Sequence, residues 1–73
     1  MHRAGSVVET AQGLLVCRGD DDVDIGATLV DDSLTDVGRI VDVFGPVDRP
    51  YFAVSPAPDV HPPRLVGERL YVR

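Results

Sequence analysis

The sequence predicts an all-β protein: a small six-stranded antiparallel β-barrel that forms a single domain over residues 1–73. The first observation behind this fold class is that apolar residues, Val above all, come in runs of about four to seven, the usual length of strands. The second is that seven Gly and six Pro punctuate the chain, so turn signals recur at short intervals. Closing so small a sheet would leave no strand edge exposed. The expected strands cover residues 5–10, 14–18, 27–30, 37–44, 51–55 and 69–72.

In the N-terminal half, the boundaries come from turn residues. Gln12 and Gly13 separate the first two strands, and an acidic loop at 19–24 precedes the short third strand. Asp31, Asp32 and Ser33 predict a turn before the fourth strand, because their short side chains can bond to nearby backbone amides.

In the C-terminal half, prolines set the boundaries. Gly45-Pro46 ends the fourth strand, since Pro donates no backbone hydrogen bond and restricts the residue before it. Four further prolines predict a stiff, extended loop between the fifth and sixth strands. These are Pro56, Pro58, Pro62 and Pro63.

The charge balance restricts the possible partners. Twelve acids, ten of them Asp, stand against seven bases that are all Arg, for a net charge of −5. Such a chain repels polyanions, which argues against nucleic acid or an anionic membrane as its main partner. Many Asp without Lys suggests a halophilic, haloarchaeal origin, although a merely acidic mesophilic domain stays open.

The cellular compartment is inferred from two features of the sequence: its cysteine count and the length of its apolar runs. Cys17 is the single cysteine, so no internal disulfide can form, which fits a reducing cytosol. No apolar run approaches the roughly 20 residues of a membrane span. We expect a cytoplasmic protein.

The fourth expected strand is apolar on both faces. Alternation at period two puts Ile40 and Phe44 on one face and Val37, Val41 and Val43 on the other. A barrel strand with water outside needs only one apolar face, so the outer one is expected to be covered. The cover is either a partner protein or a loop that folds back, and a bulge near Phe44 is a third explanation.

The following segment, residues 44–52, combines two prolines with three aromatic residues. Prolines fix a loop in one shape and so reduce the entropy lost on binding. Aromatic residues and Arg are also frequent interface hot spots. The plainer interpretation is that Phe44, Tyr51 and Phe52 fill the core. One or two of them can, but three would crowd so small a barrel.

Catalytic and ligand-binding constellations are missing. Cys17 lies in an apolar strand, where an inert thiol is far commoner than a nucleophile. His2 and His61 are too far apart in sequence for a zinc motif. The acidic run at 20–24 lacks the Gly and Glu of a calcium loop, so it is expected to be solvated. We therefore expect no enzyme activity, catalytic residue, cofactor or metal.

The segment at residues 37–47 (VGRIVDVFGPV), followed by 50–54 (PYFAV), resembles the archaeal Gar subunit of the H/ACA ribonucleoprotein, the RNA-guided pseudouridylation complex. Three further segments match in order and spacing, so the resemblance covers nearly the whole chain. They are 5–16, which fits the family's first hairpin, 25–31 (IGATLVD) and 66–72 (VGERLYV).

This resemblance implies a barrel of the translation-factor type and a non-catalytic accessory subunit. It would bind a dyskerin-like pseudouridine synthase and assist substrate loading and product release in rRNA processing and ribosome biogenesis. Guide and substrate RNA would be reached only through the complex, and the free subunit is expected to be monomeric. Carried over by position, the partner-binding residues are Val43, Phe44, Gly45, Pro46, Val47, Pro50 and Tyr51. Gly38 and Ile40 are weaker candidates that can serve the barrel itself.

Two other interpretations stay open. A PRC-barrel-like module of ribosome maturation would share the strand at 38–43, but the Phe44-Gly45-Pro46-Val47 continuation is not regular in that group. A small enzyme using Cys17 or His61 would instead require a reactive thiol at neutral pH.

Overall fold

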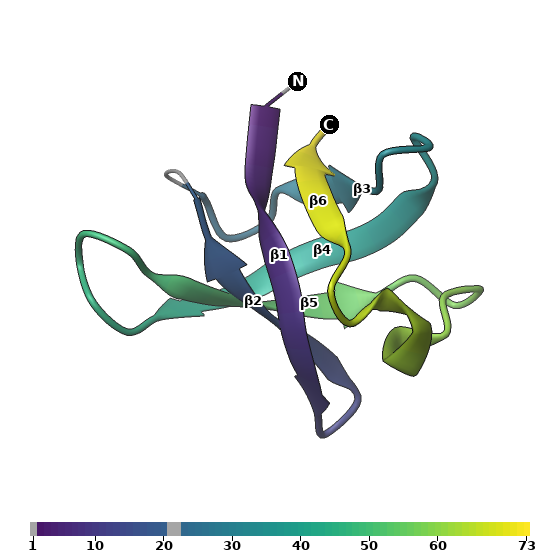
Figure 1. The fold of residues 1–73 in the computed structure, drawn as a ribbon, viewed down its shortest axis with the longest axis horizontal. Coiled ribbons are helices and arrows are strands. Elements are labelled where there is room, and N and C mark those ends of the chain that lie inside the picture. Colours follow the sequence, from purple (N-terminus) through teal and green to yellow (C-terminus); the bar gives the residue numbers. More distant parts are fainter. Residues whose placement is uncertain (1, 21–22) are drawn as a thin grey trace.

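The computed structural model describes residues 2–20 and 23–73, and the strands in these ranges form a closed antiparallel barrel (Figure 1). Its order around the barrel is β1-β2-β5-β4-β3-β6. The elements are β1 (His2–Ala11), β2 (Leu14–Gly19), β3 (Thr28–Val30), β4 (Asp36–Phe44), β5 (Tyr51–Pro56), the 3-10 helix η1 (Pro62–Leu65) and β6 (Arg69–Val72). The predicted fold class is thus confirmed. The predicted acidic loop falls partly on residues 21–22, which lie outside the described ranges.

Strand β1 is longer than expected, because it begins at His2 and pairs with two neighbours. One register shift between Val7 and Glu9 faces β2, and another between Arg3 and Gly5 faces β6. Each bulge bends the strand and increases its twist, which helps one strand reach both sides of the closure.

Two predicted turns are confirmed. Gln12 and Gly13, with φ of 54° and 79°, link β1 to β2. Between β3 and β4, the Asp31 carboxylate oxygen Oδ1 accepts hydrogen bonds from the amides of Ser33 (2.9 Å) and Thr35 (3.0 Å). The short Asp side chain therefore fixes the turn locally, as its position in the sequence predicted.

The predicted alternation along β4 is wrong. Val37 and Ile40, three residues apart, are both buried, while Val41 and Phe44 are both exposed. The register of β4 shifts twice: on β3 between Asp36 and Gly38, which leaves Val37 extra, and on β5 between Ile40 and Asp42, which leaves Val41 extra. The first shift lies at Val37, ahead of Ile40, and the second lies between Ile40 and Phe44. A bulge of this kind reverses the side-chain alternation beyond it. The bulge interpretation therefore holds, with the bulge at Val41, ahead of Phe44.

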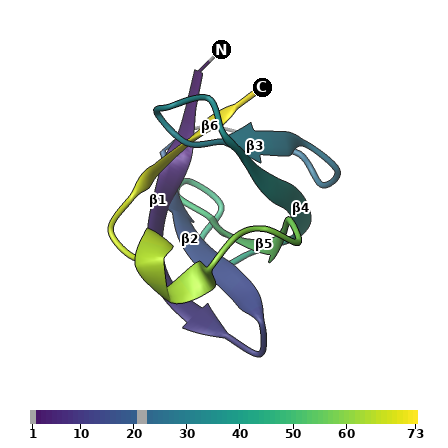
Figure 2. The same ribbon diagram turned by 90° about the vertical axis from the view of Figure 1, so that its right-hand side faces the viewer.

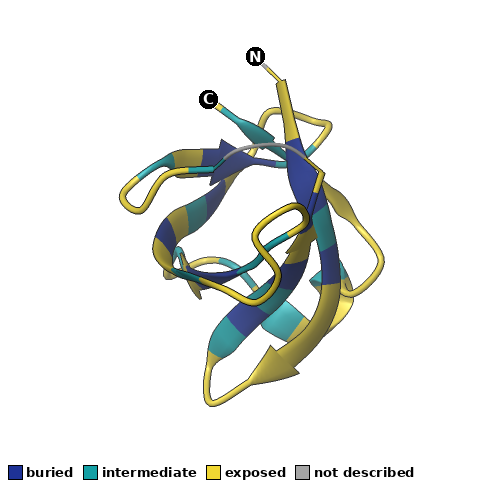
Figure 3. Cartoon of the chain, turned by 90° about the vertical axis from the view of Figure 1, so that its left-hand side faces the viewer, coloured by how far each residue is buried: buried dark blue, intermediate teal, exposed yellow. Residues whose placement is uncertain are grey.

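The core is made of inward-facing apolar residues from all six described strands, and the strands alternate between buried and exposed stretches (Figure 3). Phe52 is the largest fully buried side chain. Gly5 makes room for it: a Cβ at Gly5 would overlap the Arg18 carbonyl oxygen and lie 3.0 Å from the Phe52 ring.

The expected extended proline loop is only partly correct. Pro62 and Pro63 instead open η1, because the fixed φ of Pro suits the first positions of a helical turn and its missing amide hydrogen is not needed there. Figure 2 shows η1 beside β1 at one end of the barrel. Leu65 packs there against the core, so η1 covers that end. No helix in the described ranges is long and apolar enough to cross a membrane.

Candidate functional site

The hairpin formed by β4 and β5 carries the candidate site. Phe44, the last residue of β4, pairs with Tyr51, the first residue of β5, and the loop at 45–50 projects from the barrel between them (Figure 1). Gly45 starts this loop with φ of 91°, a backbone conformation that favours Gly. A Cβ at Gly45 would lie 3.1 Å from the Tyr51 ring, so Gly also lets that ring lie close to the chain.

The three aromatic residues of this segment divide between inside and outside. Phe52 is fully buried, as expected for at least one of them. The rings of Phe44 and Tyr51 stack outside the barrel, with centroids 5.9 Å apart and planes inclined by 16°. Phe44 nevertheless remains 43% exposed. A ring held in place by a neighbour but open to solvent is well suited to contact a partner.

Further apolar groups lie exposed on β4 and its loop. Val41, at the bulge, is 43% exposed, and Val47, in the loop, is fully exposed. We use the name docking face for Val41, Phe44, Val47 and Tyr51, because we propose below that a partner contacts them. Val41 was considered only as a strand residue in the sequence, because the bulge that turns it outward has no recognisable pattern.

The predicted partner-binding residues occupy three different environments. Val43 is half-buried and packs against the core. Pro50 and Tyr51 are half-buried at the start of β5. The exposed ones are Phe44, Gly45, Pro46 and Val47. Of the weaker candidates, Ile40 is fully buried and Gly38 is half-buried.

The loop is tied to the end of β2. The Pro50 carbonyl accepts a hydrogen bond from the Gly19 amide at 2.8 Å. The Asp20 carboxylate contacts Arg49 in the loop at 3.7 Å and Arg3 in β1 at 3.0 Å. Exposed ion pairs stabilise a fold by only about 0.2 to 1 kcal/mol each. The Gly19–Pro50 hydrogen bond and the Asp20–Arg49 ion pair both reach the loop and favour the conformation seen. Arg3 holds the Asp20 side chain from β1.

Arg18 adjoins the docking face and was missed by sequence reasoning. It pairs with Tyr51 across β2 and β5, and its guanidinium carbon lies 5.6 Å from the centre of the Tyr51 ring. A cation at this distance is attracted by the ring's electrons. Its outward position could have been inferred from the inward pair Leu15 and Cys17, but its neighbour across the sheet could not.

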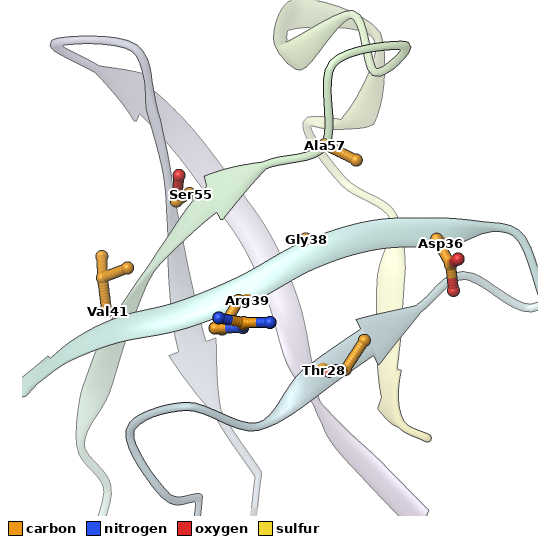
Figure 4. Close-up of a pocket in the computed structure, with 7 residues that line it drawn as sticks. All are labelled: Thr28, Asp36, Gly38, Arg39, Val41, Ser55 and Ala57. Atoms are coloured by element: carbon orange, nitrogen blue, oxygen red, sulfur yellow. The ribbon is translucent and has the colours of Figure 1, made fainter.

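A hollow of about 420 Å³ lies next to Val41, across β3, β4 and β5 (Figure 4). Its lining residues are Thr28, Asp36, Gly38, Arg39, Val41, Ser55 and Ala57. Gly38 is required in this wall, because a Cβ there would overlap the Ser55 carbonyl oxygen. Because Val41 lines it, the hollow adjoins the docking face on the side of the bulge.

Cys17 does not have the properties of a nucleophile. Its side chain is fully buried, and burial raises the pKa of its thiol from 9.0 to about 12. The thiol is therefore protonated at neutral pH, whereas the thiolate is the reactive form. His61 is exposed. In the described ranges no group of three or more His, Cys, Asp or Glu side chains could hold a metal ion.

Comparison with known protein families identifies the chain over its full length. The family model described as the Gar1/Naf1 RNA binding region matches residues 1–73. The chain belongs to this family. The resemblance seen in the sequence is thereby confirmed at the level of the family, and membership suggests an accessory role of the H/ACA ribonucleoprotein type.

Two similar proteins of the curated set come from archaea, and both are uncharacterized. One, from Methanothermobacter thermautotrophicus, is 31% identical over 64 residues, which cover 84% of this chain and 70% of the relative. The other, from Methanocaldococcus jannaschii, is 35% identical over 48 residues, or 66% of this chain and 58% of the relative. These relatives support the family but add no biochemical activity. The haloarchaeal origin stays a prediction.

The family's description names RNA binding, and the charge distribution of this member bears on that point. Ion pairs engage three of its arginines within the described ranges: Arg3 and Arg49 with Asp20, and Arg73 with Asp36. With a net charge of −5, the chain as a whole repels a phosphate backbone. The docking face, in contrast, consists of apolar and aromatic side chains.

Proposed function

We propose that this protein is a non-catalytic accessory subunit of the H/ACA ribonucleoprotein that binds a dyskerin-like pseudouridine synthase. In this role it assists substrate loading and product release during rRNA pseudouridylation. Membership of the Gar1/Naf1 family supports the assignment to this complex. The observation that carries protein docking is the stacked pair Phe44 and Tyr51, together with a fully exposed Val47 in the loop that joins them.

The energetics favour this surface as a contact. Full burial of one side chain the size of Val or Phe stabilises a complex by about 1.5 to 3 kcal/mol. Val47 has its whole side chain available for such burial, and Phe44 a large part. Because Pro46, Pro50 and the Asp20 ion pairs restrict the loop, less conformational entropy is lost on binding.

The proposed contact residues are those carried over from the family, with different duties. Phe44, Pro46, Val47 and Tyr51 would touch the synthase directly. Val43, which packs against the core, would support Phe44 from beneath. Gly45 and Pro50 would set the course of the loop.

RNA is proposed to be reached indirectly, through the synthase. The net charge of −5 opposes a long phosphate contact, and pairing with carboxylates reduces what several arginines could offer. The PRC-barrel-like alternative would put a ribosomal protein on the same face, so the choice of partner decides between the two.

The experiment is reconstitution of the cognate synthase, guide RNA and substrate RNA with and without this protein. Co-elution with the synthase in size exclusion, at micromolar concentration and in molar potassium chloride, is the expected result. Turnover should also rise under excess substrate while a single turnover keeps its rate, since release and loading are assisted and the chemistry is not. Absence of co-elution would remove the proposal.

A further inference from the structure

Arg18 belongs to a continuous outward-facing row that crosses four strands. Phe44 pairs with Tyr51, Tyr51 with Arg18, and Arg18 with Ser6. Directly opposite residues of neighbouring strands lie side by side on the same face of a sheet. The row therefore passes from the aromatic half of the docking face to a cation, and then to a small polar residue.

In the part of the chain that the structure describes, the Arg18 side chain contacts an aromatic neighbour and forms no salt bridge. Its guanidinium carbon lies 5.6 Å from the centre of the Tyr51 ring. A cation–π contact uses the positive charge of the guanidinium and no acceptor atom, so its N–H groups stay available as hydrogen-bond donors. Those donors form a planar fork, which matches the two oxygens of a carboxylate.

Among residues 2–20 and 23–73, the charges around Arg18 leave this fork without an anion. Within the described ranges Arg18 has no carboxylate within ion-pair distance, whereas Arg3, Arg49 and Arg73 each do. Asp20, two residues further along the chain, is already engaged by Arg3 and Arg49.

A partner that covers the aromatic pair would also change the hydration of the Arg18 guanidinium. A partner that packs on Phe44 and Tyr51 also removes water from Arg18, which lies against the same ring. Desolvating an unpaired charge opposes association, whereas a charge-assisted pair in the same place offsets that cost and fixes the register. Partner surfaces without an anion at this position are disfavoured, so the residue acts on specificity.

We propose that Arg18 is a specificity residue of the docking face, selecting a partner surface that carries a carboxylate directly beside an apolar patch. This inference rests on the proposed function, since it concerns the same face and the same protein partner. It adds the chemistry that the partner must present: an Asp or Glu side chain positioned over the Arg18 fork.

The test measures the affinity of the synthase for four forms of the protein by titration calorimetry. Arg18→Met keeps the apolar stem against Tyr51 but removes the charge, and Arg18→Lys keeps the charge but removes the fork. Arg64→Met is the matched control, because Arg64 is exposed on η1 and its loss changes the net charge equally. Arg18→Met should weaken binding on the order of ten- to a hundredfold, Arg18→Lys less, and Arg64→Met less than about twofold.

The outcomes separate this inference from the proposal beneath it. If the unaltered protein binds and Arg18→Met behaves like Arg64→Met, the role of Arg18 is refuted while synthase docking stands. If the unaltered protein does not bind, both fall. A parallel titration uses single-stranded RNA: if Arg18→Met abolishes RNA binding and leaves synthase binding unchanged, Arg18 serves a phosphate, and the carboxylate assignment is wrong.

Discussion

Phe44 and Tyr51 hold the base of the projecting loop together, because their stacked rings join the last residue of β4 to the first residue of β5. The loop between them therefore starts and ends at a fixed separation. The same two rings therefore fix the ends of the loop and form part of the apolar surface next to it. A change in either ring should alter both the contact surface and the shape that presents it.

Replacing Phe44 by Ala should weaken synthase binding by roughly ten- to a hundredfold, within the range of interface hot spots. The free energy of unfolding should fall by less than about 1 kcal/mol, since Phe44 is 43% exposed. Calorimetric titration and urea denaturation measure the two effects. Val66→Ala is the control, because Val66 is 48% exposed but lies outside the docking face. Equal losses for the two variants would remove the site assignment.

Replacing Asp20 by Asn should loosen the loop at Arg49 by removing both ion pairs. We expect a few-fold loss of affinity and a stability change below about 1 kcal/mol, because exposed pairs contribute little. The affinity loss should shrink in molar salt, where the Debye length is about 3 Å. Asp32→Asn, in the turn between β3 and β4, serves as the control. A loss that does not depend on salt would point to a cause other than these ion pairs.

Replacing Gly5 by Ala should lower the free energy of unfolding by about 3 kcal/mol, a large part of the stability of a barrel of this size. The added Cβ would overlap the Arg18 carbonyl oxygen, which is backbone and cannot move aside. Circular dichroism during thermal unfolding measures the loss. Ser6→Ala, one residue further along, should be nearly neutral. Native-like stability of Gly5→Ala would mean that β1 and β2 are less closely spaced.

Replacing Gln12 by Asn should stabilise the barrel by about 0.5 to 1 kcal/mol. Gln12 has φ of 54° and precedes Gly13 with φ of 79°. Asn tolerates this backbone region better than Gln, and Asn-Gly is the preferred pair in such hairpin turns. The urea midpoint should rise with an unchanged slope. Gln12→Thr should destabilise, because a β-branched residue is disfavoured there, and the opposite order would contradict this explanation.

The Cys17 thiol should resist labelling by disulfide reagents at neutral pH in the folded protein and react at once in denaturant. Burial raises its pKa from 9.0 to about 12. The unfolded chain loses this proton above pH 9 while the folded protein keeps it. Stability should therefore be unaffected below pH 9 and fall between pH 9 and 12, by at most about 1.4 kcal/mol per pH unit from this group. Cys17→Ala, which lacks this slope, isolates the contribution, and rapid labelling at pH 7 would revive the enzyme interpretation.

The strand boundaries were largely predictable because local turn chemistry defines them. Gly45-Pro46 ends β4 and Gln12-Gly13 joins β1 to β2, as the sequence indicated. A bulge in β4 was one of the explanations that the sequence offered, but its position was not predictable. Val41 is an apolar residue like Ile40 and Val43, so nothing in the sequence marks it as the extra residue. Only the register of β4 against β5 reveals it.

The candidate site was predictable where it depends on the loop and unpredictable where it depends on pairing. Phe44 and Val47 stood out through the prolines and aromatic residues around them. Arg18 lies in β2 and reaches Tyr51 only because β2 pairs with β5, a long-range relationship that no local pattern encodes.

The position of β6 has a consequence for synthesis of the chain. This strand closes the barrel by pairing with β1 on one side and β3 on the other. Until residues 69–72 leave the ribosome, a nascent chain has two strands with unpaired edges and a core open on one side. Such edges recruit other strands. The barrel therefore cannot close before residues 69–72 have left the ribosomal tunnel, and the nascent barrel is exposed to mispairing until then.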